Sequence, residues 1–287
     1  MVQPPVVGPP RPRHLITPHE LAALQHERDD VRILDVRWSL GGPAGGPLHA
    51  EGHIPGAVYV DLETELAGTP VLTEGRHPLP ELAALQAAAR RWGINPSDTV
   101  VVYDDLGGHS AARAWWLLRY AGVVDVRLLD GALAAWRGAG LPLQSGATSV
   151  APGTIHLDYG HLPTLSMEEA GNLPEHGILL DARAAERFRG EVEPVDPRAG
   201  HIPGAVSAPA SGNLGTDGTF RSPAELAARY EQLGVRPDTP VGVYCGSGVT
   251  AAHDALALMV AGFWPALYPG SWSQWSNHPE RPVATGE

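Results

Sequence analysis

An internal repeat constrains the fold of this chain more than any other feature of its sequence. The segment ILDVRW at 33–38 corresponds to LLDARA at 179–184, and EGHIPGAV at 51–58 corresponds to AGHIPGAV at 199–206. These pairs keep the same order and lie about 140–150 residues apart. Two copies of one domain are the simplest explanation, and a length of 287 residues is enough for two domains.

The ends of the repeat suggest where the domains begin and end. We predict a first domain over 14–144 and a second over 162–287, joined by a linker at 145–161 that is rich in Gly, Ser and Thr. Residues 1–13 are rich in proline and lack the apolar stretch of a secretory signal, so we expect a flexible lead and a cytoplasmic protein.

Each copy alternates strand patterns with helix patterns. In the first copy, Thr17 starts a capping box before a helix pattern, and the apolar run at 31–36 is typical of a buried strand. An amphipathic helix pattern at 80–93, a β-branched strand pattern at 99–105 and a further helix pattern at 110–122 follow. This alternation predicts an α/β fold with two tandem domains, each a mostly parallel sheet flanked by helices on both faces.

Composition excludes several classes of function. With 43% hydrophobic residues the chain can form real cores, yet no run approaches the ~18 apolar residues of a membrane span. A net charge of −12 argues against nucleic acid and anionic membranes as partners. The single cysteine, Cys245, excludes an internal disulfide and a multi-cysteine zinc site.

Cys245 lies between a strand pattern at 241–244 and a helix pattern at 251–262. Open α/β sheets bind ligands at the carboxyl ends of their strands, which is where this arrangement places the cysteine. Gly246 and Gly248 let the backbone curl so that its N–H groups point inward, and the helix adds its positive N-terminal end. Such donors favour a thiolate over a thiol and would hold a persulfide or an oxyanion.

Other interpretations of this loop stay open. A free cysteine is often only a small buried hydrophobic residue. A phosphate-binding loop would need the GxxxxGK[ST] motif, which is absent here. The C-x5-R cradle of phosphatases and arsenate reductases is a closer rival, but Ala251 stands where that cradle has its arginine.

With this loop and the duplication together, the sequence resembles the two-domain rhodanese-like sulfurtransferases over about 14–287. CGSGVTA at 245–251 is typical of 3-mercaptopyruvate sulfurtransferases, whereas thiosulfate-specific rhodaneses usually have a more cationic loop. GRHPLP at 75–80 and GSWSQW at 270–275 also resemble this family. The resemblance implies a catalytic second domain and an inactive first domain, in which Asp104 stands in the place of the cysteine.

The resemblance also implies a two-step transfer of sulfur. The Cys245 thiolate takes sulfur from 3-mercaptopyruvate and becomes a persulfide, and pyruvate leaves. An external thiol such as thioredoxin, or cyanide, then removes the outer sulfur. The acceptor must come from outside because the chain has no second cysteine, and no metal or organic cofactor is required.

Two arginines are candidates for binding the donor. Arg187 stands where the family has an arginine for the substrate carboxylate, and a guanidinium fork suits such an anion. The family often has a second arginine nine residues later, where this chain has Asp196; we expect Arg198 to replace it. The alternative for Arg187 is a surface ion pair with a neighbouring glutamate.

The resemblance implies a proton relay between Ser247 of the loop and His77 of the first domain, completed by an acid. The acid is Glu63, where the family usually has aspartate, with Asp61 beside it. The alternative is that His77 only packs at the domain interface.

The remaining loop residues, Gly246, Gly248, Val249 and Thr250, are expected to surround the donor. We expect the Thr250 hydroxyl to close the cradle and to cap the following helix. Other residues of the motifs are interpreted as scaffold: Trp272, Trp275, His53, His201, Asp35 and Asp181.

Two alternative functions remain at this point. A thiosulfate:cyanide sulfurtransferase would use the same cysteine, since a neutral loop can still turn over thiosulfate. A non-catalytic binding module belongs to a different class, because rhodanese-like domains often lose the cysteine and serve as partner surfaces. The intact loop at 245–250 argues against a binding module.

Overall fold

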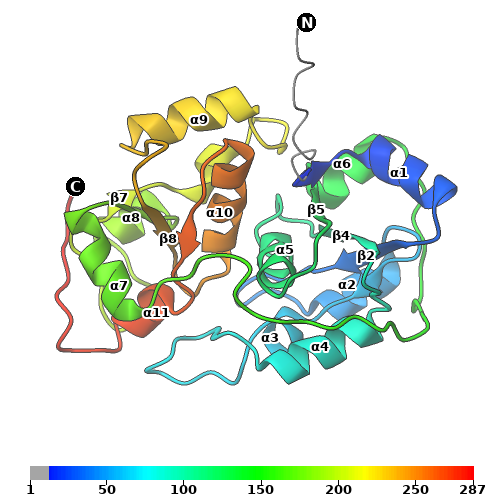
Figure 1. The fold of residues 1–287 in the computed structure, drawn as a ribbon, viewed down its shortest axis with the longest axis horizontal. Helices are drawn as coiled ribbons and strands as arrows, with labels where there is room; N and C mark the ends of the chain where they lie inside the picture. Colours follow the sequence, from blue (N-terminus) through cyan, green and yellow to red (C-terminus); the bar gives the residue numbers. More distant parts are fainter. Residues whose placement is uncertain (1–12) are drawn as a thin grey trace, which may run out of the picture.

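The computed structural model describes residues 13–287 and shows two α/β units (Figure 1). The lead predicted over 1–13 lies outside the described residues, apart from Arg13. The first unit is coloured blue to green in Figure 1, and the second is coloured green to red. Every helix within the described part of the chain is too short or too polar to cross a membrane.

The first unit is built on a five-stranded parallel sheet with the strand order β1-β5-β4-β2-β3. Its strands are β1 (Leu15–Ile16), β2 (Val31–Asp35), β3 (Val58–Tyr59), β4 (Thr99–Tyr103) and β5 (Val126–Leu129). Its helices are α1 (Pro18–Glu27), α2 (Gly45–Glu51), α3 (Leu62–Glu65), α4 (Leu82–Arg91), α5 (Ala111–Tyr120) and α6 (Ala132–Gly138). Apolar side chains of α4 and α5 cover one face of the sheet, and those of α1 and α6 cover the other.

The second unit repeats this arrangement with a parallel sheet in the order β7-β6-β8-β9. Its strands are β6 (Ile178–Asp181), β7 (Val206–Ser207), β8 (Val241–Tyr244) and β9 (Ala266–Leu267). Its helices are α7 (Met167–Asn172), α8 (Ala185–Phe188), α9 (Pro223–Gln232), α10 (Thr250–Val260) and α11 (Ser271–Trp275), with 3-10 turns η1 (Leu173–Glu175) and η2 (Ala210–Asn213).

The two sheets have corresponding strand orders. Thr164 forms a parallel bridge with Leu267 of β9, at the place where β1 pairs with β5 in the first unit. The sequence repeat is therefore a repeat of structure, and the predicted α/β fold class is confirmed.

Local sequence signals account for several element ends. Thr17 and Glu20 form the predicted capping box at the start of α1. Gly93, Gly122 and Gly262 follow α4, α5 and α10 with φ of +82°, +90° and +95°. This left-handed conformation costs glycine little, so each of the three helices ends where its glycine stands.

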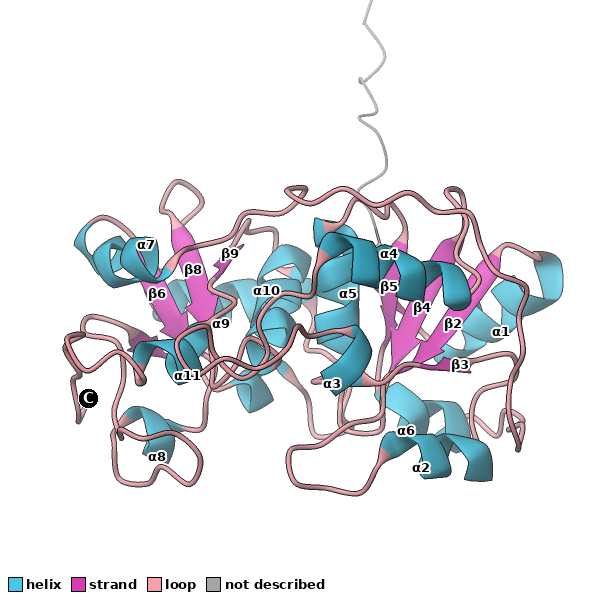
Figure 2. Ribbon diagram, turned by 90° about the horizontal axis from the view of Figure 1, so that it is seen from below, coloured by secondary structure: helices cyan, strands magenta, loops and turns pink. Residues whose placement is uncertain are grey.

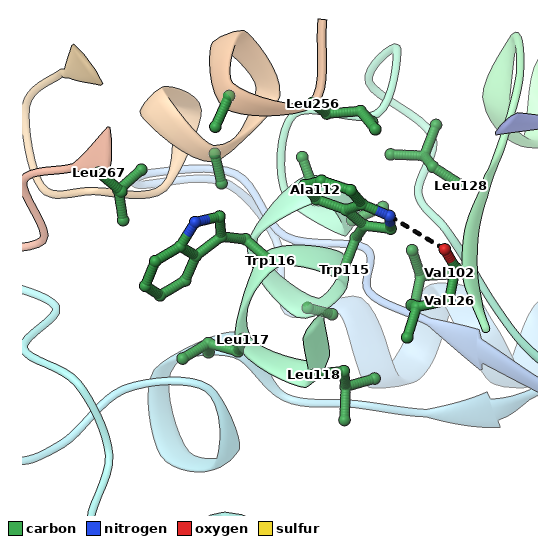
Figure 3. Packing of buried hydrophobic residues seen from close by; sticks show 14 of the residues in the cluster. Val102, Ala112, Trp115, Trp116, Leu117, Leu118, Val126, Leu128, Leu256 and Leu267 are labelled. Atoms are coloured by element: carbon green, nitrogen blue, oxygen red, sulfur yellow. Dashed lines mark hydrogen bonds between the residues drawn. The ribbon is translucent and has the colours of Figure 1, made fainter. Parts of the chain in front are cut away.

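The two units share one apolar core. Helices α5 and α10 lie between the two sheets and pack against each other (Figure 2). Trp115 and Trp116 of α5 belong to the same buried cluster as Leu256 of α10 and Leu267 of β9 (Figure 3). The Trp115 indole N–H donates to the Val126 carbonyl at 3.0 Å, so this tryptophan is buried without an unpaired donor.

Polar contacts across the same interface are reciprocal. Arg113 of α5 donates from Nη1 to the Gly248 carbonyl at 3.3 Å, in the loop after β8. His253 of α10 approaches the Gly107 carbonyl with Nε2 at 3.2 Å, in the loop after β4. The interface helix of each unit thus contacts the loop at the carboxyl end of the other unit's central strand.

Candidate active site

Cys245 follows the last residue of β8 and lines a cavity of about 240 Å3. The residue is only 2% exposed, and its Sγ accepts a hydrogen bond from the Gly248 N–H at 3.2 Å. Its own N–H donates to the Ser271 hydroxyl at 3.2 Å, which ties the start of the loop to the first residue of α11. The sulfur is therefore buried but faces a cavity, as a reactive thiol requires.

The backbone of the loop is curled around this sulfur. Gly248 has φ of +77°, and a Cβ there would lie 2.4 Å from the Pro269 carbonyl oxygen, so only glycine fits. Among the described residues, no acceptor is bonded to the N–H groups of Gly246, Ser247, Val249 or Thr250. These groups are free to bind an anion at the N-terminus of α10.

The matching loop of the first unit shows what such a backbone binds. Asp104 follows β4 as Cys245 follows β8, and it is fully buried. Its carboxylate accepts five hydrogen bonds of 2.8–3.0 Å, from the N–H groups of Leu106, Gly108, Ser110 and Ala111 and from the Ser110 hydroxyl. In this unit the chain's own carboxylate occupies the anion cradle.

Ser247 and His77 lie together, as the family resemblance implies. Ser247 Oγ and His77 Nδ1 are 2.7 Å apart, and both residues are buried. Burial, followed by the charges of Arg113 and Arg76, lowers the pKa of His77 to about 4, so this imidazole is neutral at neutral pH. A neutral Nδ1 without a proton can accept the hydroxyl proton of Ser247.

The expected acid of the relay does not contact His77. Glu63 is exposed and accepts a hydrogen bond from Trp38 Nε1 at 3.0 Å, while the Trp38 ring packs edge-on against His77 at 5.4 Å. Asp61 is the N-cap of α3 and accepts from the Thr64 N–H at 3.0 Å. The prediction for these two acids needs correction, because an indole separates Glu63 from the imidazole and Asp61 is engaged as a helix cap.

Three arginines, Arg76, Arg183 and Arg187, line the cavity, and no carboxylate from the described part of the chain does. Arg187, the residue predicted for the donor, donates from Nε and Nη2 to Glu193 at 3.3 and 2.6 Å and from Nη2 to Asp196 at 3.3 Å. The cavity lining is therefore positively charged, while the Glu193 and Asp196 carboxylates that pair with Arg187 do not line the cavity. Burial raises the pKa of the Asp196 carboxyl above its ordinary value, against the lowering effect of Arg76 and Arg187.

The structure does not place Arg198 at the cavity. Its guanidinium donates to four backbone carbonyls at 2.7–2.9 Å, those of Trp275, Ser276, His278 and Arg281. Nearly all N–H groups of the Arg198 guanidinium are thus hydrogen-bonded to the C-terminal segment. The expectation that Arg198 supplies a second donor-binding arginine is not supported by this placement.

Val249 and Thr250 differ in part from expectation. Both line the cavity, but Val249 is the N-cap of α10 and Thr250 is its first residue, and the cap has no side-chain hydrogen bond. The expected capping by the Thr250 hydroxyl is therefore wrong, because this residue already has helical geometry.

The residues interpreted as scaffold have structural contacts. Trp272 and Trp275 are buried in one apolar cluster. His53 and His201 approach backbone carbonyls with Nδ1 at 2.7 and 2.8 Å. The remaining two form buried ion pairs, Asp35 with Arg37 and Asp181 with Arg183.

Sequence reasoning missed Arg76 and Trp38 as cavity residues. Trp38 ends the ILDVRW segment of the repeat, and Arg76 directly precedes His77 in the GRHPLP segment that carries the family resemblance. Within residues 13–287 no group of three His, Cys, Asp or Glu side chains is placed to hold a metal ion.

The comparisons with known proteins agree with the two-unit fold. The family model for the rhodanese-like domain matches twice, over 17–139 and 166–278. The chain belongs to the rhodanese-like family. Its two matches follow the two sheets, so this rhodanese-like protein has the tandem form predicted from the repeat.

Curated relatives span nearly the whole rhodanese-like chain. A Mycobacterium tuberculosis protein provisionally named thiosulfate sulfurtransferase SseB is 49% identical, covering 95% of this chain and 97% of the relative. A Pseudomonas aeruginosa protein provisionally named 3-mercaptopyruvate sulfurtransferase is 48% identical, covering 95% and 98%. The crystal structure of SseA from Escherichia coli, described as a 3-mercaptopyruvate sulfotransferase, matches with a TM-score of 0.80 and 33% identity over 91% of this chain and 99% of that one.

Proposed function

We propose that this protein is a sulfurtransferase that moves sulfur from 3-mercaptopyruvate to an external thiol or cyanide through a persulfide on Cys245. One contrast carries the proposal. The cradle of the first unit is filled by the Asp104 carboxylate, whereas the equivalent loop of the second unit surrounds a thiol and keeps four N–H groups free. A persulfide anion would fill that cradle as the carboxylate fills the other.

In the first half-reaction the Cys245 thiolate attacks the sulfur of 3-mercaptopyruvate. An S–S bond forms, the C–S bond of the donor breaks, and its electron pair goes to carbon as the enolate of pyruvate. The thiol proton of the donor ends on that carbon, so a persulfide anion and pyruvate balance the step. The Ser247–His77 pair supports this transfer, since a neutral imidazole 2.7 Å from the hydroxyl can take a proton and return it.

In the second half-reaction a thiolate or cyanide attacks the outer sulfur, and the electron pair of the broken S–S bond returns to Cys245. A hollow of about 360 Å3 shares Trp38, Val249 and Thr250 with the cysteine cavity. We propose that an external thiol such as that of thioredoxin approaches from this hollow. We propose the cytoplasm as the compartment, because acceptor thiols are kept reduced there.

Thiosulfate is the second candidate donor. The lining arginines suit its sulfonate-like oxygens as well as a carboxylate, and the Mycobacterium tuberculosis relative carries that donor in its provisional name. The loop argues for 3-mercaptopyruvate, since it has no cation between Cys245 and Thr250 and the hydroxyl of Ser247 is paired with His77.

Two measurements test the proposed function. Mass spectrometry after treatment with each donor should show a gain of about 32 Da on Cys245, one sulfur atom. The kcat/KM for 3-mercaptopyruvate should exceed that for thiosulfate, and Cys245→Ser should abolish both activities without unfolding the protein. A chain that gains no sulfur from either donor would be a binding module, and a clear preference for thiosulfate would reject the choice of donor.

A further inference from the structure

The start of α11 holds two carbonyl groups of the loop that follows β8, here called the reactive loop. The Trp272 N–H donates to the Cys245 carbonyl at 2.9 Å. The Ser273 N–H donates to the Gly246 carbonyl at 2.8 Å. Because a trans peptide directs its C=O and its N–H to opposite sides, these two bonds turn the N–H groups of Gly246 and Ser247 away from α11. The helix start therefore helps to set the direction of the free N–H groups in the cradle.

Ser273 also binds the first unit. Its hydroxyl accepts a hydrogen bond from the Arg76 N–H at 3.0 Å and donates one to the Gly270 carbonyl at 3.1 Å. The residue is 1% exposed, so water cannot readily replace either partner. Arg76 is the residue before His77. One buried serine thus joins the loop of Cys245 to the segment that carries the relay histidine.

Arg113 of α5 holds the same two segments at a second point. Its Nη2 donates to the His77 carbonyl at 3.0 Å, and its Nη1 donates to the Gly248 carbonyl at 3.3 Å. The backbone before His77 is therefore fixed through Ser273, and the backbone after it is fixed through Arg113. Loss of the serine hydroxyl should loosen His77 without releasing the whole segment.

The first unit lacks this hydroxyl at the equivalent position. GALAAW at 131–136 corresponds to the GSWSQW motif, so Ala134 stands in the place of Ser273. The backbone contact of the turn is kept there, because the Leu133 N–H donates to the Asp104 carbonyl at 2.9 Å. Alanine is therefore compatible with this turn, and the hydroxyl supplies a contact that the copy without the cysteine does not have.

We propose that Ser273 is a positioning residue that sets the distance between His77 and Ser247. The inference rests on the proposed function, in which this pair moves a proton. Ser273 binds the residue before each member of the pair, through the carbonyl of Gly246 and the N–H of Arg76. The contact of 2.7 Å between Nδ1 and Oγ is therefore spanned by one side chain. A small displacement of the imidazole would lengthen this contact and slow proton transfer.

Hydrogen exchange measures the contact itself. In Ser273→Ala the Arg76 N–H loses its acceptor, so its exchange, resolved by mass spectrometry, should be at least about tenfold faster. Ser276→Ala is the matched control. Ser276 directly follows α11 and is 3% exposed, and its hydroxyl has no hydrogen-bond partner within residues 13–287. This variant should leave the exchange of Arg76 unchanged. Unchanged exchange in Ser273→Ala would overturn the inference.

A double-mutant cycle shows whether the contact acts through His77. In the wild-type background, Ser273→Ala should lower kcat for 3-mercaptopyruvate about tenfold and change KM less than about twofold. In the His77→Asn background, the same substitution should lower kcat less than about twofold, and Ser276→Ala should keep the wild-type kcat. An equal loss in both backgrounds would mean that Ser273 only stabilises the fold, and the positioning role would be rejected.

Thiosulfate separates a positioning role from a general loss of activity. Attack on its outer sulfur breaks the S–S bond of the donor and releases sulfite with the electron pair, so the same persulfide forms without proton transfer. Persulfide formation from thiosulfate should therefore change less than about twofold in Ser273→Ala, whereas formation from 3-mercaptopyruvate should slow about tenfold. Equal slowing with both donors would contradict the inference. Wild-type protein that forms no persulfide would defeat the proposed function, and the exchange measurement would still decide whether Ser273 holds the Arg76 segment.

Discussion

Asp104 and Cys245 hold the same position in the two copies, each directly after the central strand of its sheet and before the helix at the interface between the units. The carboxylate of Asp104 binds five donors of its own loop, whereas the sulfur of Cys245 accepts one. The same loop, between the central strand and the interface helix, thus serves two purposes. In the first unit it stabilises the fold, and in the second its free N–H groups are available for chemistry.

This relationship predicts a large cost for Asp104→Ala. The substitution leaves five donors unpaired around a fully buried site, so the free energy of unfolding should fall by about 3 kcal/mol or more. Asp105→Ala, at the exposed neighbour, is the control and should change it by less than about 0.5 kcal/mol. Denaturant unfolding measures both. Equal stability of the two variants would mean that the Asp104 cradle is not a stabilising feature.

Gly248→Ala should damage the active loop more than Gly246→Ala. At position 248 both the φ of +77° and the Pro269 carbonyl oppose a side chain, so we expect kcat/KM to fall at least about 100-fold. At position 246 the nearest obstacle is the end of the flexible Arg76 side chain, 3.2 Å away, and a smaller loss is expected. Gly262→Ala is the control for strain alone, since its φ is +95° but nothing lies within 4 Å. Steady-state assays with circular dichroism would distinguish lost activity from lost fold; a fully active Gly248→Ala enzyme would contradict the loop geometry.

His77 predicts a loss of stability on acidification. Because its pKa falls from 6.5 to about 4 on folding, the unfolded chain binds a proton between these values that the folded protein does not. Stability is therefore lost as the pH drops from about 6.5 to about 4, with a share on the order of 2–3 kcal/mol from this residue. In His77→Asn the difference in unfolding free energy between about pH 7.5 and about pH 4.5 should shrink by that amount.

The exposed His19 provides the control for this pH dependence. His19→Gln should keep the wild-type difference between the two pH values. If His77→Asn also kept the wild-type difference in unfolding free energy, the lowered pKa of His77 would be contradicted.

Arg198→Met should weaken the fold and spare donor binding. Four backbone carbonyls of the C-terminal segment lose their partner, so the free energy of unfolding should fall by about 2–4 kcal/mol. The KM for 3-mercaptopyruvate should stay within about twofold of the wild type, because the guanidinium lies away from the cavity lining. A tenfold rise in KM at unchanged stability would instead support a role of Arg198 in binding the sulfur donor.

The fold could be predicted from the sequence because the sequence signals that specify its elements are local. The capping box at Thr17, the β-branched run of β4 and the glycines after α4, α5 and α10 each specify a conformation within a few residues. The order of these signals along the chain predicts a parallel sheet in each copy, and the repeat predicts two. The reactive loop was found in the same way, as a cysteine and two glycines between a strand and a helix.

The relay and the donor-binding arginines depended on contacts between distant segments. Ser247 and His77 are 170 positions apart and still meet at 2.7 Å, which motif resemblance predicted. The same resemblance did not reveal that Trp38 separates Glu63 from the imidazole, or that Glu193 occupies the fork of Arg187. Those arrangements depend on side-chain directions that spacing along the chain does not encode.

The sequence by itself determined two α/β copies, the position of the one thiol at the end of a strand, and the carboxylate in its place in the other copy. Only the tertiary structure decided which charged groups face that thiol. Packing of α5 against α10 joins the units, and Arg76 of one lies beside Gly246 of the other. Contacts within the second unit hold Arg198 against the C-terminal backbone. The physical reason is that a guanidinium binds whichever acceptors the folded chain sets within its reach, and these come from segments far apart in sequence.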